Sequence, residues 1–516
     1  MSSRKMFLVM DDQEEKHDQP WPSYHIEVPK RLEVIKERLT TTGLLTNSRI
    51  EHIPRREASE DEILEVHTKR YVDDVKATET MTVDQQEAFC TQYEDIYVNS
   101  ATWRRAKLAA ASAIDLVRAV ATSRSKMNGI AFIRPPGHHA MPDEGCGFCI
   151  FNNVAIAARH AVKSGVARKV MIVDYDVHAG NGTQECLETE DGGESVKLIS
   201  IHRYEHGKFW PNMPQTGIYH NYRNTQNIPL NTTSLTDSDY LALFTHIILP
   251  TIHTFQPDLL IVSSGFDAAL GDPEGYMNVT PAGFATMIRM LMDTGIPVAA
   301  ILEGGYFLEA LAADAEWVVR ALLGEKIPRI HVESIHPSIA EVIGRIHRRY
   351  QKTSGFFRKN QELRDVIKGT KELEDAAEPL SDYKGERTVC APYDTRGIYT
   401  PFTEEKVEGF RSELKRILES YRKMSEMEDV EVHDYIEEIS TVDEHVDQNF
   451  VGIKNGKLAF GSNAKLFVEL LFICPLDTIY AARPIGDSNF DDIQLDDSLK
   501  ELKYIKIFEH LPIFQL

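Results

Sequence analysis

Five short apolar runs, each ending in a polar or glycine-rich cluster, restrict the possible folds of this chain more than any other feature. Between residues 129 and 306 the runs GIAFI, KVMIV, KLISI, DLLIV and VAAIL lead into RPPGHH, DYDVHAGNG, HRYEHG, SSGFDAALGDPEG and EGGY. Uninterrupted apolar runs of this length are typical of strands that are buried on both faces, as in a parallel sheet. The pattern therefore predicts an α/β domain in which such strands alternate with helices.

Helix signals lie between these runs. In NNVAIAARHAVKSG the expected N-cap is Asn152 or Asn153, and in TPAGFATMIRMLMDTG it is Thr280, with Pro281 at the first helical position. N-cap side chains accept hydrogen bonds from the free N–H groups of the first turn, where proline needs no partner. A glycine closes each segment, as is common after the last helical turn.

The polar clusters bring chemistry to one edge of the predicted sheet. In open α/β sheets the ligand crevice lies outside the carboxyl ends of the strands, so the five clusters are expected to meet there. A single aspartate or histidine at such a place is commonly a cap or core residue, but here a whole set occurs in order. The set consists of His138, His139, Asp174, Asp176, His178, Asp267 and Tyr306.

Three of these residues suit a metal ion. Asp176, His178 and Asp267 offer two carboxylates and one imidazole, a ligand set typical of a catalytic divalent metal that keeps one position open for water. Such a metal acidifies water, and a nearby imidazole can take the proton while the water attacks a carbonyl. The adjacent histidines of the first cluster are placed for that work, and Tyr306 for donating a hydrogen bond to the oxyanion that forms.

The charge of the chain limits its partners. Of 516 residues, 79 are acidic and 57 are basic, which gives a formal net charge of −22. Direct binding to nucleic acid or to an anionic membrane needs clustered lysine and arginine, so neither is expected. The most basic stretch, from Arg345 to Lys359, is expected to form the solvated face of a helix.

The cysteines and the apolar runs indicate an intracellular protein. Six cysteines in so long a chain do not form a disulfide framework, and the first residues do not resemble a signal peptide. The apolar run that starts at Phe467 is interrupted by Glu469, Pro475 and Asp477, so it is not expected to span a bilayer. We expect a reducing compartment: the cytoplasm, the nucleus or both.

Changes in composition divide the chain into three parts. Residues 1–325 hold all the clusters and form the expected catalytic domain. In residues 326–400, charged helices are expected from about 337 to 379, followed by a linker rich in proline, glycine and polar residues. Residues 401–516 start with a helix that is expected from Thr403 to about Glu426 and continue with strand-like segments of unknown function.

Several motifs resemble those of a known family. RPPGHHA, GFCIFNNVAIAA, VDYDVHAGNGTQ, SIHRYEHGKFWP, SSGFDAALGDPEG and LEGGYFLEALA look like the signature segments of the zinc-dependent histone deacetylases, specifically class IIb. The match covers about residues 5–325. It implies an arginase-deacetylase-like fold, a single parallel sheet flanked by helices, with a smaller C-terminal α/β or α+β region outside it.

The resemblance also implies roles. Asp176, His178 and Asp267 resemble the ligands of one catalytic Zn²⁺, and Asp174 and Ser200 match a monovalent-cation site, expected to hold K⁺. The tyrosine that polarises the substrate carbonyl is a histidine in the feeble class IIa enzymes, so a tyrosine at this place favours a competent catalyst. The implied catalytic residues are His138, oriented by Asp174; His139, the general base and acid; Asn181, where class I enzymes have aspartate; and Tyr306.

The implied substrate site is a narrow apolar channel. Phe148 and Trp210 would wall it around the stem of an acetylated amine, and the Gly147 carbonyl would accept the amide N–H. Glu274 resembles the gatekeeper of the polyamine-deacetylating class IIb member, while Glu94 and Asp95 would add negative potential nearby. A turn-capping role of Glu274 remains an alternative.

The sequence departs from the family pattern in two places. Ala179 replaces a histidine beside a ligand, and the acidic Pro-Glu-Cys-Glu helix that narrows the polyamine channel aligns with Pro22-Ser23-Tyr24-His25. The predicted function is therefore removal of acetyl groups from acetyllysine of histones or other proteins, with acetylspermidine as the alternative substrate and regulatory complexes as possible partners. An arginase-type two-metal enzyme or a catalytically idle binding scaffold are the rival interpretations.

Overall fold

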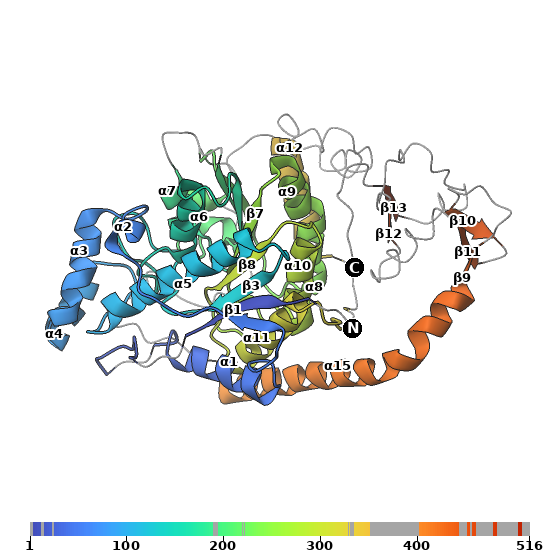
Figure 1. Cartoon of the computed structure of the whole chain (residues 1–516), viewed down its shortest axis with the longest axis horizontal. Coiled ribbons are helices and arrows are strands. Elements are labelled where there is room, and N and C mark those ends of the chain that lie inside the picture. Colours follow the sequence, from blue (N-terminus) through green and yellow to red (C-terminus); the bar gives the residue numbers. More distant parts are fainter. Residues whose placement is uncertain are drawn as a thin grey trace. The chain divides into compact units, whose positions relative to one another are not determined.

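The computed structural model divides into two compact units (Figure 1). It describes residues 4–11, 15–22, 25–188, 195–218, 220, 222–328, 330, 335–350, 402–442, 451–454, 457–460, 478–481 and 504–507. The first unit comprises the described residues of 1–292, 296–327 and 335–411, and the second those of 293–295, 328–334 and 412–516. The division into a catalytic domain (1–325), a linker region and a C-terminal region stays a prediction.

The first unit is built on one parallel sheet of eight strands, as the sequence predicts. The spatial order is β2-β1-β3-β8-β7-β4-β5-β6, and each neighbouring pair is parallel. The strands are β1 (Met6–Met10), β2 (Ile50–His52), β3 (Asn128–Phe132), β4 (Val170–Asp174), β5 (Val196–Arg203), β6 (Thr225–Leu230), β7 (Leu259–Ser264) and β8 (Val298–Leu302).

The five apolar runs form β3, β4, β5, β7 and β8, the middle of the sheet. The strands that this pattern leaves out lie toward the edges, where a strand needs less apolar sequence. β6 is one of them: it contains Pro229 and lies at the end of the sheet, the place where a proline costs no ladder hydrogen bond.

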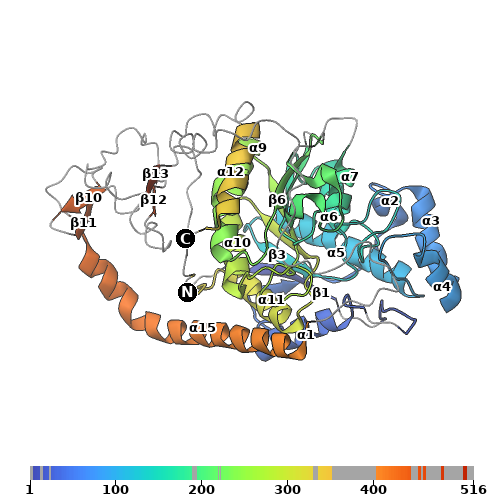
Figure 2. The same ribbon diagram turned by 180° about the vertical axis from the view of Figure 1, so that it is seen from behind.

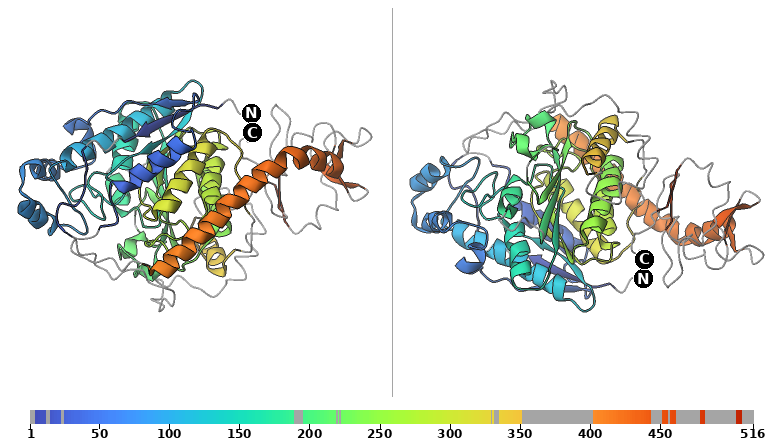
Figure 3. Two further views of the ribbon diagram at one scale, coloured as in Figure 1. Left: turned by 90° about the horizontal axis from the view of Figure 1, so that it is seen from below. Right: turned by 90° about the horizontal axis from the view of Figure 1, so that it is seen from above.

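Helices cover both faces of the sheet (Figure 3). In β4, Val170 and Ile172 belong to the core beneath α5 and α6, whereas Met171 and Val173 point to the opposite face, because successive strand side chains alternate. All four side chains are buried. The helices of this unit are α1 (Lys30–Thr41), α2 (Glu60–Ile63), α3 (Lys69–Ala77), α4 (Val83–Cys90), α5 (Thr102–Thr122), α6 (Asn153–Lys163), α7 (Asn181–Leu187), α8 (Asp237–Leu243), α9 (Leu249–Phe255), α10 (Pro281–Met292), α11 (Leu308–Leu322) and α12 (Pro337–Tyr350).

The helix starts are confirmed. Asn152 is the N-cap of α6, and its side chain accepts a hydrogen bond from the Ala155 amide. The Thr280 hydroxyl accepts one from the Gly283 amide (3.2 Å), and Pro281 is the first residue of α10. α12 packs against β6 and α8 (Figure 2) and carries the first arginines of the predicted basic face. It coincides with the start of the charged helices that the sequence predicts, and the rest of these helices and the linker up to residue 400 lie outside the described residues.

The tail contributes one long helix. α15 (Glu404–Ile439) begins where the sequence predicts a helix and continues thirteen residues beyond the predicted end near Glu426. Its first residues, up to Arg411, belong to the first unit. No helix within the described ranges is long and apolar enough to cross a membrane. The described strands of the second unit are β9 (Ser440–Val442), β10 (Val451–Lys454), β11 (Lys457–Phe460), β12 (Thr478–Ala481) and β13 (Tyr504–Ile507).

The register of the central strands determines where the polar clusters meet. Asp174, the last residue of β4, is level with Ser200 of β5 on one side and with Ser263 of β7 on the other. Since all these strands are parallel, the segments that follow them emerge at the same edge of the sheet. The two predicted ligand segments, one after β4 and one after β7, are therefore adjacent.

Candidate active site and metal centre

The three predicted metal ligands come together at this edge. Asp176 and His178 lie just after β4 and Asp267 just after β7, with donor atoms within 4.8 Å of one another. His178 Nδ1 is 3.2 Å from Asp267 Oδ2 and 3.3 Å from Asp176 Oδ1. All three side chains are buried, so the donor atoms converge on one enclosed point.

This donor set fits a divalent cation. Backbone amides hold the outer carboxylate oxygens: Val177 N donates to Asp267 Oδ1 (2.7 Å) and Gly304 N to Asp176 Oδ2 (2.8 Å). A side chain at Gly304 would put its Cβ 2.3 Å from Asp267 Oδ2, so only glycine fits there. Burial, together with the charge of Asp176, raises the pKa of Asp267 to about 7. A cation between the two carboxylates would remove that repulsion.

The two adjacent histidines have different partners. His138 Nδ1 is 3.0 Å from Asp174 Oδ2, whereas His139 Nδ1 is 2.7 Å from Asn181 Oδ1. Burial alone lowers the pKa of His138, but the carboxylates of Asp176 and Asp174 outweigh it and raise that pKa well above its usual value. For His139, burial and then the neighbouring imidazoles of His138 and His178 lower the pKa well below its usual value. His139 is therefore the neutral imidazole of the pair.

The turn that presents these histidines is held by a carboxylate that sequence reasoning missed. Glu303 accepts the backbone amides of Gly137 (2.7 Å) and His138 (3.2 Å). A Cβ at Gly137 would lie 2.6 Å from Asn153 N, so the turn needs glycine here. Burial raises the pKa of Glu303 to about 7. The sequence signal was its place at the end of β8, next to the GGY cluster.

Tyr306 projects into the same site from the loop after β8. Its backbone N donates to Asp272 Oδ2 (2.6 Å), and its ring lies edge-on to Phe148, with the ring centres 5.7 Å apart. The guanidinium carbon of Arg31 is 4.9 Å from the centre of the Tyr306 ring. Burial raises the pKa of the Tyr306 hydroxyl well above its usual value, so the hydroxyl keeps its proton and acts as a donor.

A buried ion network lies behind this loop and was also missed. Arg31 Nε donates to the Gly305 carbonyl (2.7 Å), and Arg31 Nη1 is 3.0 Å from Glu27 Oε1. Glu27 also accepts from Arg134 and from the Tyr97 hydroxyl (2.8 Å). Glu27 and Arg31 are four residues apart in HIEVPKRL, the spacing of an ion pair, but their partners are distant in sequence.

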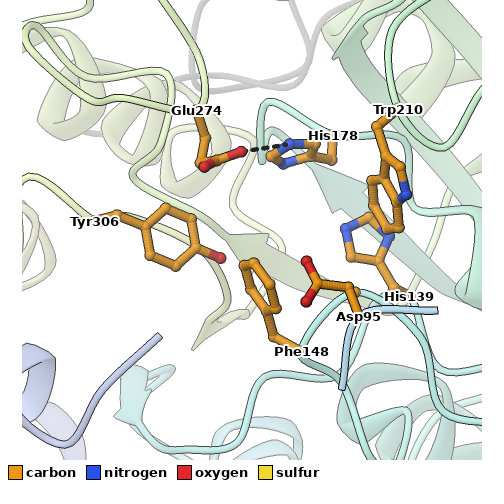
Figure 4. Close-up of a pocket in the computed structure, with 8 residues that line it drawn as sticks. Asp95, His139, Phe148, His178, Trp210, Glu274 and Tyr306 are labelled. Carbon is orange, nitrogen blue, oxygen red and sulfur yellow. Dashed lines mark ion pairs between the residues drawn. The ribbon is translucent and has the colours of Figure 1, made fainter. Parts of the chain in front are cut away.

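The predicted channel residues surround one pocket (Figure 4). Gly147 has a φ of 49°, and a Cβ there would lie 2.3 Å from Trp210 Cη2, so the channel wall needs glycine. The residues that line the pocket are Asp95, His139, Gly147, Phe148, His178, Trp210, Glu274 and Tyr306. Glu94 lies behind the wall, where its carboxylate accepts the Trp210 indole N–H (2.9 Å).

Glu274 faces His178, one of the predicted metal ligands, across the pocket. Its Oε2 is 3.8 Å from His178 Nε2, an ion-pair distance that is too long for a hydrogen bond (Figure 4). The carboxylate that closes the GDPEG turn belongs to Asp272, which accepts the backbone amides of Glu274 (2.9 Å) and Phe307 (3.1 Å). The side chain of Glu274 is 2% exposed, so a cationic group beside it would be largely desolvated.

The remaining predicted residues are placed as follows. Asp174 and Ser200 are register partners, and Ser200 Oγ accepts the Gly180 amide (3.3 Å). Ala179 is buried next to His178, and its change from histidine leaves the three donors assembled. In the segment that aligns with the acidic helix, residues 23 and 24 lie outside the described residues, while the His25 ring packs edge-on to Phe148, with the ring centres 4.8 Å apart.

Three relatives illustrate what the chain is similar to. It is 43% identical over 332 residues to polyamine deacetylase HDAC10 of Danio rerio, covering 63% of this chain and 48% of that protein. It is 41% identical over 320 residues to histone deacetylase 15 of Arabidopsis thaliana (61% and 56% covered). It is 36% identical over 418 residues to histone deacetylase HDA1 of Candida albicans (74% and 50% covered). The chain spans about half the length of the curated relatives it matches.

The fold and the family domain agree with these relatives. A crystal structure of an HDA15 HD domain matches with a TM-score of 0.61 and 35% sequence identity, covering 71% of this chain and 98% of that one. The histone deacetylase domain family matches residues 25–322, a range that holds every residue of the pocket. Since this match covers more than half of the 516 residues, the chain belongs to the histone deacetylase family.

Proposed function

We propose that this protein hydrolyses acetyl groups from acetylated primary amines with the help of one Zn²⁺. The observation that carries the proposal is the convergence of Asp176, His178 and Asp267 on one point, beside His139 and Tyr306 in a single pocket. A catalytically idle scaffold would lack at least one of these groups. An arginase-type enzyme would need a carboxylate-rich segment of the DVD type directly after β7, where SSGFDAAL offers one aspartate, Asp267.

Zn²⁺ suits the donor set because it accepts mixed nitrogen and oxygen ligands and leaves a position open. When bound, the metal supplies a Lewis acid that acidifies a water molecule and polarises the acetyl carbonyl. Nδ1 of His178 faces the two carboxylates, so this atom is the nitrogen donor, and Nε2 points toward Glu274.

His139 moves the protons of the reaction. With Nδ1–H donated to Asn181 Oδ1, Nε2 has a lone pair that accepts a proton from the attacking water. The water oxygen bonds to the acetyl carbon, the C–N bond then breaks, and the proton passes from Nε2 to the departing amine. The products are acetic acid and a primary amine, which at neutral pH become acetate and the ammonium form of the amine as the second water proton passes between them, and His139 returns to its neutral state.

Tyr306 stabilises the charge that develops on the acetyl oxygen. Its hydroxyl keeps its proton at neutral pH and lies in the same pocket as His139. The amide of Tyr306 is held by Asp272, and its ring lies between Phe148 and the guanidinium of Arg31. A donor held in this way is ready for the oxyanion before the reaction starts.

The first substrate class is acetyllysine of histones or other proteins. Phe148 and Trp210 provide apolar walls for a stem of methylene groups, and the Gly147 carbonyl would accept the amide N–H of the substrate. Acetylspermidine is the second candidate, and Glu274 favours it because a buried carboxylate in the pocket would attract a distal ammonium group. The likeness to a polyamine deacetylase supports this candidate as well.

Asp174 and Ser200, beside the proposed zinc site, are the candidates for a K⁺ site. A K⁺ beside Asp174 and Ser200 would support the loop that carries the ligands, since the two residues adjoin in the sheet. The formal net charge of −22 opposes direct binding to the negatively charged backbone of nucleic acid, so we propose no nucleic-acid partner. We propose that the protein works in the cytoplasm, the nucleus or both, within regulatory complexes.

A substrate panel tests the function. The purified full chain, loaded with zinc, is incubated with acetyllysine peptides, acetylated histones and acetylated spermidines, and acetate release is measured. We expect the unsubstituted chain to turn over at least one substrate class. We expect no turnover by Asp267→Asn, because this change replaces the charged carboxylate with a neutral amide of the same size. Absence of acetate release from every substrate by zinc-loaded protein would contradict the proposal.

A further inference from the structure

The first turns of α15 pack against the turn that carries Glu274. Thr403 caps this helix, since its hydroxyl accepts a hydrogen bond from Lys406 N (3.3 Å). Phe402, Lys406 and Phe410 form a small cluster: Lys406 Nζ is 4.5 Å from the Phe402 ring centre, and the rings of Phe402 and Phe410 are 5.3 Å apart. This cluster contacts the turn that carries Glu274.

Tyr276, two residues after Glu274, is the main contact of the cluster. Its ring centre is 4.9 Å from that of Phe402 and 4.7 Å from Lys406 Nζ. From the sheet side, the guanidinium carbon of Arg203 is 5.7 Å from the same ring. Two cations thus contact one aromatic ring, and each such contact is attractive. Tyr276 has a φ of 53°, a strained conformation that persists where the surroundings hold it.

A second contact reaches the loop that carries Tyr306. The Phe410 ring lies 6.4 Å from that of Phe307, and Arg411 Nε donates to Glu309 Oε1 (2.6 Å). Gly271 lies under this contact, because a Cβ there would be 2.9 Å from Phe410 Cβ and 2.8 Å from the Phe307 ring. Residues 402–411 therefore cover both loops at their outer surface.

The two loops are connected to each other beneath this cover. Asp272 accepts the backbone amides of Glu274, Tyr306 and Phe307 through its two carboxylate oxygens. Arg203 Nη1 donates to the Gly275 carbonyl (3.1 Å), which fixes the turn from the side of β5. A displacement of Tyr276 or Phe307 would therefore be passed to the two side chains that face the substrate.

We propose that residues 402–411 form a positioning element of the active site, with Phe402, Lys406 and Phe410 holding Glu274 and Tyr306 in place through Tyr276 and Phe307. This inference rests on the proposed function. The metal ligands follow β4 and β7 and are held by the amides of Val177 and Gly304, so metal binding does not depend on this element. Even a small displacement of the side chains that face the substrate is enough to slow an enzyme strongly.

The test compares two double variants of the full chain. In Phe402→Ala/Phe410→Ala the cluster is removed. In the control, Glu404→Ala/Glu405→Ala, two exposed residues of the first turn of α15 are changed. We expect kcat/KM of the cluster variant to fall at least tenfold, with unchanged zinc content. We also expect a lower ratio of acetylspermidine to acetyllysine turnover, because only a displaced Glu274 affects the two substrates differently. Lys406→Ala should show the same change of ratio with a smaller loss of rate.

Hydrogen exchange supplies a measurement that does not need activity. Peptides that contain residues 271–276 and 306–309 should exchange faster in the cluster variant and remain unchanged in the control. Unchanged exchange and unchanged kinetics in an active chain overturn the inference. Inactivity of the unsubstituted chain toward every acetylated amine would instead overturn the proposed function, so the two failures are distinct.

Discussion

At the scale of single residues, the two histidines of the proposed catalytic pair differ in the side chain that each ring contacts through Nδ1. His138 faces the carboxylate of Asp174, whereas His139 faces the neutral amide of Asn181. Burial and the imidazoles of His138 and His178 lower the pKa of His139, and they outweigh the charge of Asp176 and the hydrogen bond to Asn181, which raise it. The partner at Nδ1 is a neutral amide and not a carboxylate. An amide therefore keeps His139 free to accept a proton at neutral pH.

Asn181→Asp should shift the pH dependence of the reaction. A carboxylate at Nδ1 stabilises the imidazolium and raises the pKa of His139, and the base is available only above that pKa. The acidic limb of kcat/KM should therefore move to higher pH by about one unit or more. Asn212→Asp, on the exposed surface, adds the same charge and should leave the limb in place. An acidic limb that stays put in Asn181→Asp would contradict the assignment of His139 as the base.

Tyr306→Phe tests the oxyanion donor. Removing one such donor typically costs about 10²–10³ in kcat, or about 3–4 kcal/mol in the transition state. The phenyl ring retains the contact with Phe148, so zinc content and melting temperature should stay at their normal values. Steady-state kinetics and metal analysis check both statements. Near-normal kcat would show that Tyr306 serves only as a loop residue.

At the scale of elements, the sequence predicts the strands but not the residues that hold the loops after them. The apolar runs identify the five central strands, and the residues that directly follow β4 and β7 include all three metal donors. Glu303 and Asp272 act through backbone amides of other segments, and such contacts leave no spacing pattern in a sequence. Residues that hold loops are thus less visible than residues that carry chemistry.

The turn from Gly271 to Tyr276 carries Glu274, the residue proposed to distinguish the two substrate classes. Glu274→Leu should lower the ratio of acetylspermidine to acetyllysine turnover by at least about tenfold, because a carboxylate about 4 Å from an ammonium group is worth about 1–4 kcal/mol in a partly solvated site. Turnover of both substrates and the melting temperature of the variant should be measured together. A purely structural role of Glu274 would lower stability and affect the two substrates alike. An unchanged ratio in a normally folded variant would leave acetyllysine as the supported substrate class.

At the scale of the whole molecule, the first unit extends beyond the family match. Sequence reasoning places every predicted catalytic residue before residue 325, and the family match ends at residue 322. Yet residues 402–411 pack on the turn of Glu274. The helix itself was predicted to begin at about Thr403, where the Thr403 hydroxyl caps it in the structure. Its partner Tyr276 lies far away in the sequence, and a helical pattern does not reveal which surface it will cover.

The central claim is that one metal ion, held by Asp176, His178 and Asp267, supports deacetylation, and a zinc titration tests it most directly. The full chain is stripped of metal with a chelator, zinc is added back, and acetate release and bound zinc are measured at each step. We predict no acetate release without metal, a rise of activity up to about one equivalent of zinc per chain, and neither binding nor activity at this site in Asp267→Ala. Full activity of the metal-free chain, or full zinc occupancy in Asp267→Ala, would contradict the account.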